Sequence, residues 1–152
     1  MPGSWVVPAV IAGVAVVMIC AYAIWRRRRR RGTHLRNLTL SEQTLERLED
    51  TRPLMLPATA REFAIAASEV VRNYIEKRFA ASATQRTTEE FLQTLLQSPN
   101  EELVRHRALL AEFLQQCDFV KFAGASLGVK DMELLYQSAR GFVLQTGEPA
   151  PA

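Results

Sequence analysis

The sequence WVVPAVIAGVAVVMICAYAIW spans residues 5–25 without a charged side chain, and RRRRRR follows directly at residues 26–31. An α-helix rises about 1.5 Å per residue, so these 21 residues span roughly 31 Å. This length matches the hydrocarbon core of a bilayer, which is about 30 Å thick. Trp5, Tyr22 and Trp25 lie near the two ends, where aromatic side chains favour the headgroup layer. The stretch therefore predicts a single transmembrane helix.

The basic block after this helix comprises Arg26, Arg27, Arg28, Arg29, Arg30 and Arg31. Because positively charged flanks of membrane helices stay in the cytoplasm, we expect the N-terminus outside and the rest of the chain inside. The arginines would then contact anionic membrane lipid, at about 1 kcal/mol each. A nucleic-acid contact is the alternative, but the block adjoins the apolar run without a spacer. We therefore predict that residues 1–31 form a transmembrane anchor with an arginine-rich stop-transfer signal.

A cleaved signal peptide is another interpretation of this segment, because Ala21-Tyr22-Ala23 resembles a cleavage site. Signal peptides carry positive charge before the apolar core, whereas here residues 1–4 hold no basic side chain and the arginines come afterwards. The charge pattern therefore favours an uncleaved anchor.

The formal net charge of +3 depends on the arginine block. Residues 32–152 hold 13 of the 19 basic residues and all 16 acidic residues, so this part has a net charge of −3. A mildly acidic domain is a poor candidate for duplex DNA or RNA, and we expect no nucleic-acid partner. The two cysteines are too few for a disulfide framework, which agrees with a reducing cytosol.

The rest of the chain divides into three predicted parts by proline positions and composition. We expect a tether at residues 32–57, a helical domain at 58–146 and a disordered, alanine- and proline-rich tail at 147–152. Within the tether, Ser41–Asp50 predicts a short helix. Arg52–Pro57 predicts an extended strap that lies on the domain core, because proline disfavours helix at the residue before it.

Apolar side chains at helical spacing predict four main helices in the domain. We expect them over residues 58–80, from Thr87, from Ser98 to about Asp118, and from about Asp131. No sustained alternation of apolar and polar residues indicates strands, so the expected class is all-α, as a bundle or orthogonal array. Capping boxes are predicted for Thr39 with Glu42 and for Thr87 with Glu90.

Few side chains in the domain have the spacing that catalysis requires. On a continuous helix, Cys117 lies about 16 Å from His106, which is too far for a nucleophile–base pair, and His34 lies in the tether. Glu89 and Glu90 fit the first turn of a helix, where negative charge complements the helix dipole. We therefore predict no catalytic residue, no metal ligand and no cofactor.

Asp118 and Lys121 are charged residues three positions apart within an apolar stretch. Because an unpaired buried charge is costly, we expect a local ion pair, with Arg86 as a further possible partner of Asp118. The alternative is a polar site on a partner-binding surface.

Three strings carry a family resemblance: VRNYIEKRF at residues 71–79, RTTEEFL at 86–92 and CDFVKFA at 117–123. In this order they resemble the cytoplasmic helical domain of bacterial membrane proteins related to the BatD group. Such proteins are encoded near MoxR-type AAA ATPases and von Willebrand factor A-domain proteins, in clusters linked to aerotolerance. The resemblance covers roughly residues 58–146. It implies a short bacterial inner-membrane relative that belongs to a protein assembly and has no catalytic residues.

These observations predict a non-enzymatic inner-membrane protein that presents a cytoplasmic helical domain to a protein partner. By the resemblance, that partner is an AAA ATPase or a von Willebrand A-domain protein. Two alternatives stay open: a membrane-anchored enzyme subunit completed by a partner chain, and a nucleic-acid binder that uses the arginine block.

Overall fold

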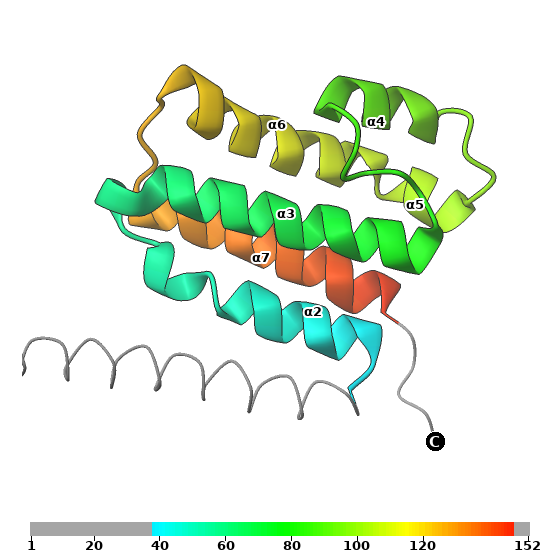
Figure 1. Ribbon diagram of the computed structural model, residues 1–152, viewed down its shortest axis with the longest axis horizontal. Coiled ribbons are helices and arrows are strands. Elements are labelled where there is room, and N and C mark those ends of the chain that lie inside the picture. Colours follow the sequence, from blue (N-terminus) through cyan, green and yellow to red (C-terminus); the bar gives the residue numbers. More distant parts are fainter. Residues whose placement is uncertain (1–37, 148–152) are drawn as a thin grey trace, which may run out of the picture. The chain divides into compact units, whose positions relative to one another are not determined.

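The computed structural model describes residues 38–147, and within them every regular element is helical (Figure 1). The six α-helices are α2 (Leu40–Glu49), α3 (Ala60–Phe79), α4 (Thr88–Leu95), α5 (Glu101–Arg105), α6 (Arg107–Ala123) and α7 (Val129–Thr146). Two short 3-10 helices, η2 (Arg52–Leu54) and η3 (Pro57–Thr59), join α2 to α3. The predicted all-α class is confirmed for these residues.

The predicted membrane anchor lies outside the described residues, as do Arg26–Arg31 and most of the predicted tail. None of the helices between residues 38 and 147 combines the length and the apolar character needed to cross a bilayer.

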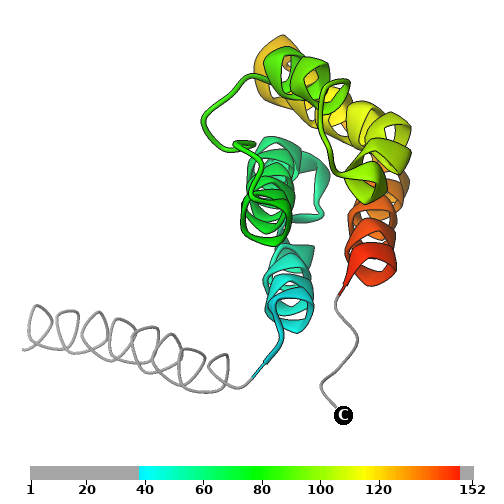
Figure 2. The ribbon, with the colours of Figure 1, turned by 90° about the vertical axis from the view of Figure 1, so that its right-hand side faces the viewer.

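Helix α3 is the central element of the domain, because it contacts α2, α6 and α7 (Figures 1 and 2). Helix α4 packs beside α6, as Figure 1 shows. The apolar stripe predicted for α3 faces the core, with Phe63, Ala67 and Tyr74 buried. The stripe predicted for the last helix is buried throughout: Met132, Leu135, Tyr136, Ala139, Phe142 and Val143.

Both predicted capping boxes are present. The Thr39 amide donates to Glu42 Oε2 at 2.8 Å, and the Glu42 amide donates to Thr39 Oγ1 at 3.3 Å. The Thr87 amide donates to Glu90 Oε2 at 3.0 Å, and the Glu90 amide donates to Thr87 Oγ1 at 3.3 Å. These bonds satisfy amides that a helix start leaves unpaired, so the local sequence alone fixes where α2 and α4 begin.

Helix α2 is part of the helical domain and not part of a tether. Its Leu48 is buried in the common core, and the compact unit begins at Thr39 rather than at residue 58. At the end of α2, Arg52 pairs with Glu49 at 3.4 Å and with Glu133 of α7 at 3.2 Å. The prediction placed the boundary at residue 58 because the burial of Leu48 and the pair of Arg52 with Glu133 involve segments that are distant in sequence.

The prediction that Arg52–Pro57 is extended is also wrong, because Arg52–Leu54 and Pro57–Thr59 form 3-10 turns. Each turn has proline within its first two positions, where the missing N–H breaks no bond. Met55 is buried as expected for a segment lying on the core, whereas Leu56 is exposed.

The predicted third helix is divided into α5 and α6 at His106. His106 Nδ1 lies 3.1 Å from the carbonyl oxygen of Glu102, the acceptor that a regular helix would give to the His106 amide. That amide instead donates to Leu103 O at 3.2 Å, which tightens the turn. The helix begins at Glu101 rather than near Ser98, and Asn100 caps it, because Asn100 Oδ1 accepts from the Leu103 amide at 3.0 Å.

Candidate functional site

Five polar side chains from α3, α4 and α6 form a bonded cluster, which we call the polar junction: Ser68, Arg72, Thr88, Asp118 and Lys121. Ser68 and Thr88 are buried, and the other three side chains are half-buried. The junction brings together all three strings that carry the family resemblance.

Asp118 and Lys121 form the ion pair that their spacing predicted, with Lys121 Nζ 3.0 Å from Asp118 Oδ1. Residues three apart on a helix share a face, which allows this contact. Lys121 Nζ also donates to Ser68 Oγ at 3.1 Å, and Thr88 Oγ1 donates to Asp118 Oδ2. The side chains of Lys121 and Asp118 are 15% and 28% exposed. The pair therefore ties α6 to both α3 and α4.

Arg72, and not Arg86, supplies the guanidinium group at this junction. Arg72 Nη2 donates to Thr88 Oγ1 at 2.6 Å, while Nη1 donates to the carbonyl oxygens of Ala83 at 2.7 Å and Arg86 at 3.0 Å. Arg86 contributes its backbone carbonyl only, and its side chain is exposed. The expected pairing of Arg86 with Asp118 is therefore wrong.

Each of the two hydroxyl groups in the polar junction both accepts and donates a hydrogen bond. Thr88 Oγ1 accepts from Arg72 and donates to Asp118, and Ser68 Oγ accepts from Lys121 and donates to the carbonyl of Ile65. Within residues 38–147, no buried side-chain nitrogen or oxygen lacks a hydrogen-bond partner. Because bonded polar groups of this kind fix one packing arrangement, the junction holds α4 and the loop before it against α3 and α6.

Cys117 lies beside the junction and is fully buried. Burial is the largest of the effects that together raise the pKa of its thiol to about 12; Lys121 and Arg72 act to lower this pKa, and Asp118 acts to raise it. Because the thiolate is the reactive form, this cysteine is suited to packing rather than to nucleophilic chemistry.

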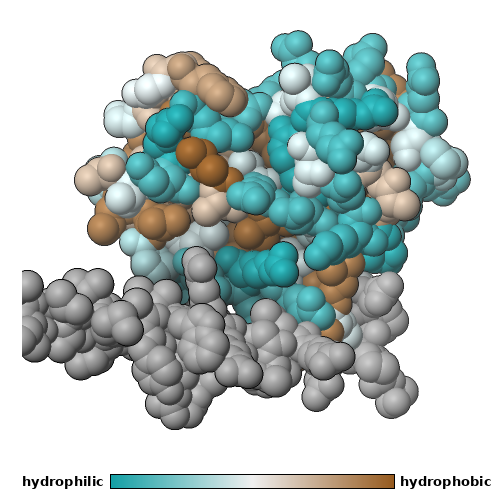
Figure 3. Space-filling model, viewed as in Figure 1, coloured by the Kyte–Doolittle hydropathy of each residue, from teal (hydrophilic) through white to brown (hydrophobic). Residues whose placement is uncertain are grey.

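The last two turns of α6 also present aromatic side chains to the solvent. Phe119 is 63% exposed and Phe122 is 82% exposed, while Lys121 Nζ lies 5.7 Å from the centroid of the Phe122 ring. In Figure 3, apolar surface reaches the solvent at the end of the domain where α6 ends and α3 and α7 begin. The string CDFVKFA thus locks the fold through one face of α6 and exposes aromatic rings on another.

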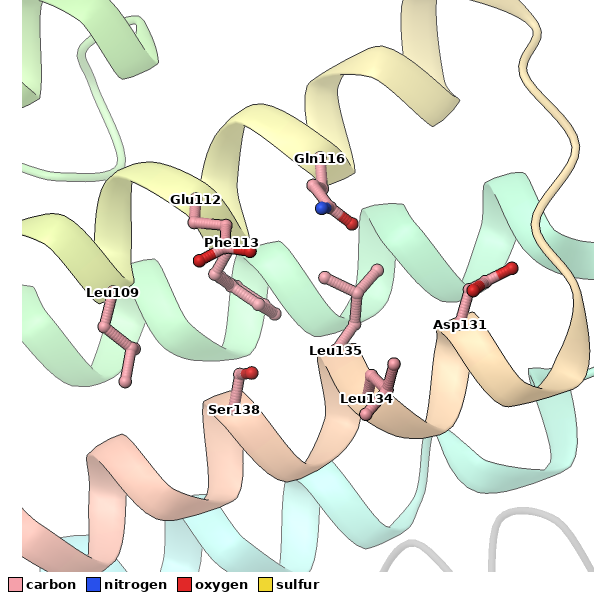
Figure 4. Close-up of a pocket in the computed structure, with 8 residues that line it drawn as sticks. All are labelled: Leu109, Glu112, Phe113, Gln116, Asp131, Leu134, Leu135 and Ser138. Carbon is pink, nitrogen blue, oxygen red and sulfur yellow. The ribbon is translucent and has the colours of Figure 1, made fainter.

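A hollow of about 170 Å³ lies between α6 and α7 (Figure 4). Phe113 and Leu135 line it as buried side chains, whereas Leu134 is 61% exposed. Glu112 and Gln116 of α6 point towards α7 in the close-up. This hollow adjoins the exposed aromatic turn of α6, and it could not be predicted from the sequence because its two sides come from different helices.

Two of the remaining candidates, His106 and Glu90, have structural partners. His106 Nε2 lies 3.2 Å from Gln145 Oε1, and its ring meets Phe142 edge-on at 5.4 Å. Glu90 closes the capping box of α4, and Glu89 lies in the same first turn. Across the described part of the chain, no three His, Cys, Asp or Glu side chains form a group that could hold a metal ion.

The roles of Arg72, Thr88 and Ser68 were not predicted from the sequence, although Arg72 and Thr88 belong to the strings that carry the family resemblance. The signal that could have identified Arg72 is its position next to the buried Val71 and Tyr74. A charged side chain beside an apolar helical stripe needs a partner, and that partner had to come from another helix.

Comparison with known proteins gives one family match. The model of the family described as "Domain of unknown function (DUF4381)" matches residues 1–145. No curated protein matches the chain. No solved structure matches it either.

Proposed function

The chain belongs to the DUF4381 family, whose model extends over residues 1–145, and we propose that it is a non-enzymatic, single-pass protein of the bacterial inner membrane. Its helical domain would lie in the cytoplasm and bind a protein partner. The anchored domain would hold a cytoplasmic partner at the membrane and so raise the partner's effective concentration there without any new contact.

The anchor part of this proposal is supported by the uncharged run at residues 5–25 and by the arginines that follow it. The length of the run suits one membrane crossing, and the position of the arginines suits a cytoplasmic C-terminal side. The family match covers this segment together with the helical domain, which supports a function that uses both.

The interaction part depends on one observation, the 82% exposure of Phe122. Covering an exposed aromatic ring with a partner protein lowers the free energy of the complex, because apolar surface is removed from water. Aromatic residues are accordingly enriched where proteins bind each other. The neighbouring Lys121 is held by Asp118 and Ser68, so the turn that carries Phe122 is fixed before any partner arrives. A fixed surface loses less conformational entropy on binding.

For the identity of the partner, we propose a MoxR-type AAA ATPase or a von Willebrand A-domain protein. This part of the proposal depends on the resemblance of residues 71–79, 86–92 and 117–123 to the BatD-related domain, together with the implied place in an aerotolerance-linked assembly.

Crosslinking followed by affinity purification from native membranes tests the proposal, with the full chain as bait. We expect the wild-type protein to recover a defined partner, and Phe122→Ser to lower that yield about fivefold or more, as for a central aromatic contact. Leu96→Ser is the matched control, because Leu96 is also exposed but lies at the end of α4.

Two results would contradict the proposal. One is the absence of any specific partner from membranes that contain the intact chain. The other is an equal loss of yield in both variants, which would point to a general effect of removing surface apolar groups. Replacing Arg26–Arg31 with alternating lysine and glutamine tests the nucleic-acid alternative, because partner binding should persist in a variant that still inserts correctly.

A further inference from the structure

The hollow between α6 and α7 continues into a second hollow of about 480 Å³, because Glu112 and Gln116 line both. We call the combined feature the α6–α7 groove and define it by Leu109, Glu112, Gln116, Phe119, Leu127 and Leu134. From residue 109 to residue 119, α6 rises about 15 Å, which is roughly three helical turns. This length suits a short helix lying against the domain.

The groove exposes apolar side chains from both of its sides. Leu134 of α7 and Phe119 of α6 are each more than half exposed, and Leu109 and Leu127 are half-buried. Amphipathic helices bind such grooves by placing apolar residues at i, i+3 or i+4 and i+7 into them.

The charge of the groove indicates the chemistry of the occupant. Among the described residues that line the two hollows, the charged ones are Glu112 and Asp131, and both are acids. Asp131 Oδ2 accepts from the Gly128 amide at 3.2 Å. Glu112 is exposed and makes no side-chain hydrogen bond or ion pair within residues 38–147, so its carboxylate is available to an incoming cation.

We propose that the α6–α7 groove binds a basic amphipathic helix of the partner protein, with leucine-like anchors in the groove and lysine or arginine beside Glu112. This inference depends on the proposed interaction function and adds the surface and the partner's chemistry. Complementary charge would set the orientation of the helix and speed its association more than it raises affinity.

Position-specific photo-crosslinking tests the proposal with the full chain in nanodiscs of neutral phosphatidylcholine. Benzoylphenylalanine replaces either Leu134 in the groove or Leu144, which lies on the same helix, is 51% exposed and lines neither hollow. The probe is a leucine–lysine peptide of about 14 residues, roughly 21 Å long as a helix. A leucine–glutamate peptide of the same pattern is the control for charge.

We expect the leucine–lysine peptide to crosslink at position 134 about tenfold more than at position 144, and more than the leucine–glutamate peptide. Glu112→Lys should lower the yield at position 134 about fivefold, because a favourable rim charge becomes a repulsive one. Glu69→Lys, the same charge change at an exposed site on α3, should leave the yield unchanged. Circular dichroism of each variant verifies that the domain is folded.

The proposal is overturned by equal yields at the two positions, by no adduct at position 134, or by equal capture of both peptides. An adduct with a second copy of this chain or with lipid would overturn it in favour of that occupant. If a partner is recovered from native membranes but position 134 gives no adduct, the groove is rejected and the proposed function stands. If the adduct forms but no partner exists in membranes, the proposed function is rejected instead.

Discussion

Asp118→Asn tests whether the polar junction stabilises the fold. The substitution keeps the shape of the side chain but removes the charge that faces Lys121 Nζ at 3.0 Å and accepts from Thr88 Oγ1. A hydrogen bond to a charged group contributes about 1.5–3 kcal/mol, and an exposed ion pair contributes about 0–1 kcal/mol. Because Asp118 is 28% exposed and asparagine retains one acceptor, we expect a loss of about 2 kcal/mol.

The change in melting temperature follows from the size of the domain. A domain of about 110 residues has an unfolding entropy near 0.23 kcal/mol/K, so a loss of about 2 kcal/mol lowers Tm by roughly 9 °C. Circular dichroism of the full chain in a non-ionic detergent measures this shift. Arg86→Ala is the internal control, because the exposed Arg86 side chain makes no hydrogen bond or ion pair within the described residues. An Asp118→Asn variant within 2 °C of the wild type, or an equally destabilised Arg86→Ala variant, would refute the structural role.

Three further predictions concern backbone strain, a buried hydroxyl and the buried thiol. Ala80 has a φ of 51° and Gly124 a φ of 64°, so Ala80→Gly should stabilise the domain by about 0.5–1 kcal/mol and Gly124→Ala should destabilise it by about 1 kcal/mol in urea titrations. Tyr74→Phe removes the 3.0 Å hydrogen bond to Thr146 in the core and should lower stability by about 1 kcal/mol by the same assay, and no change would dismiss that bond. Burial raises the pKa of Cys117 to about 12 from 9.0, so the folded state binds its proton more tightly than the unfolded state does. The free energy of unfolding should therefore not depend on the Cys117 thiol below pH 9 and should fall between about pH 9 and 12. Iodoacetamide should label Cys117 only as the domain unfolds, because the thiolate is the reactive form. Labelling of Cys117 in the folded protein at pH 8 would contradict this prediction.

Features that depend on neighbouring residues could be predicted from the sequence. The capping box of Thr87 and Glu90 forms because its two hydrogen bonds lie within one helical turn. The buried stripe of α7 follows from the 3.6-residue period of its apolar side chains. The ion pair of Asp118 and Lys121 could also be predicted, because the two residues are three positions apart and so lie on one face of the helix.

Features that depend on packing between distant segments could not be predicted in this way. Arg86 is close in sequence to the cap of α4, but Arg72 reaches Thr88 because α3 and α4 meet in space. The membership of α2 in the core depends on Leu48 meeting side chains from other helices. The break at His106 depends on a ring nitrogen that competes for the carbonyl of Glu102, a choice that helical periodicity does not encode.

We propose that the helical domain is held at the cytoplasmic face of a membrane, a placement that the topology of the full chain would reveal. Paired C-terminal reporter fusions measure this most directly: a green fluorescent protein that matures only in the cytoplasm, and an alkaline phosphatase that is active only outside it. We expect bright fluorescence in the membrane fraction and no phosphatase activity, because Arg26–Arg31 would hold their side of the proposed anchor inside. An active phosphatase fusion, or fluorescence found only in the soluble fraction, would contradict it.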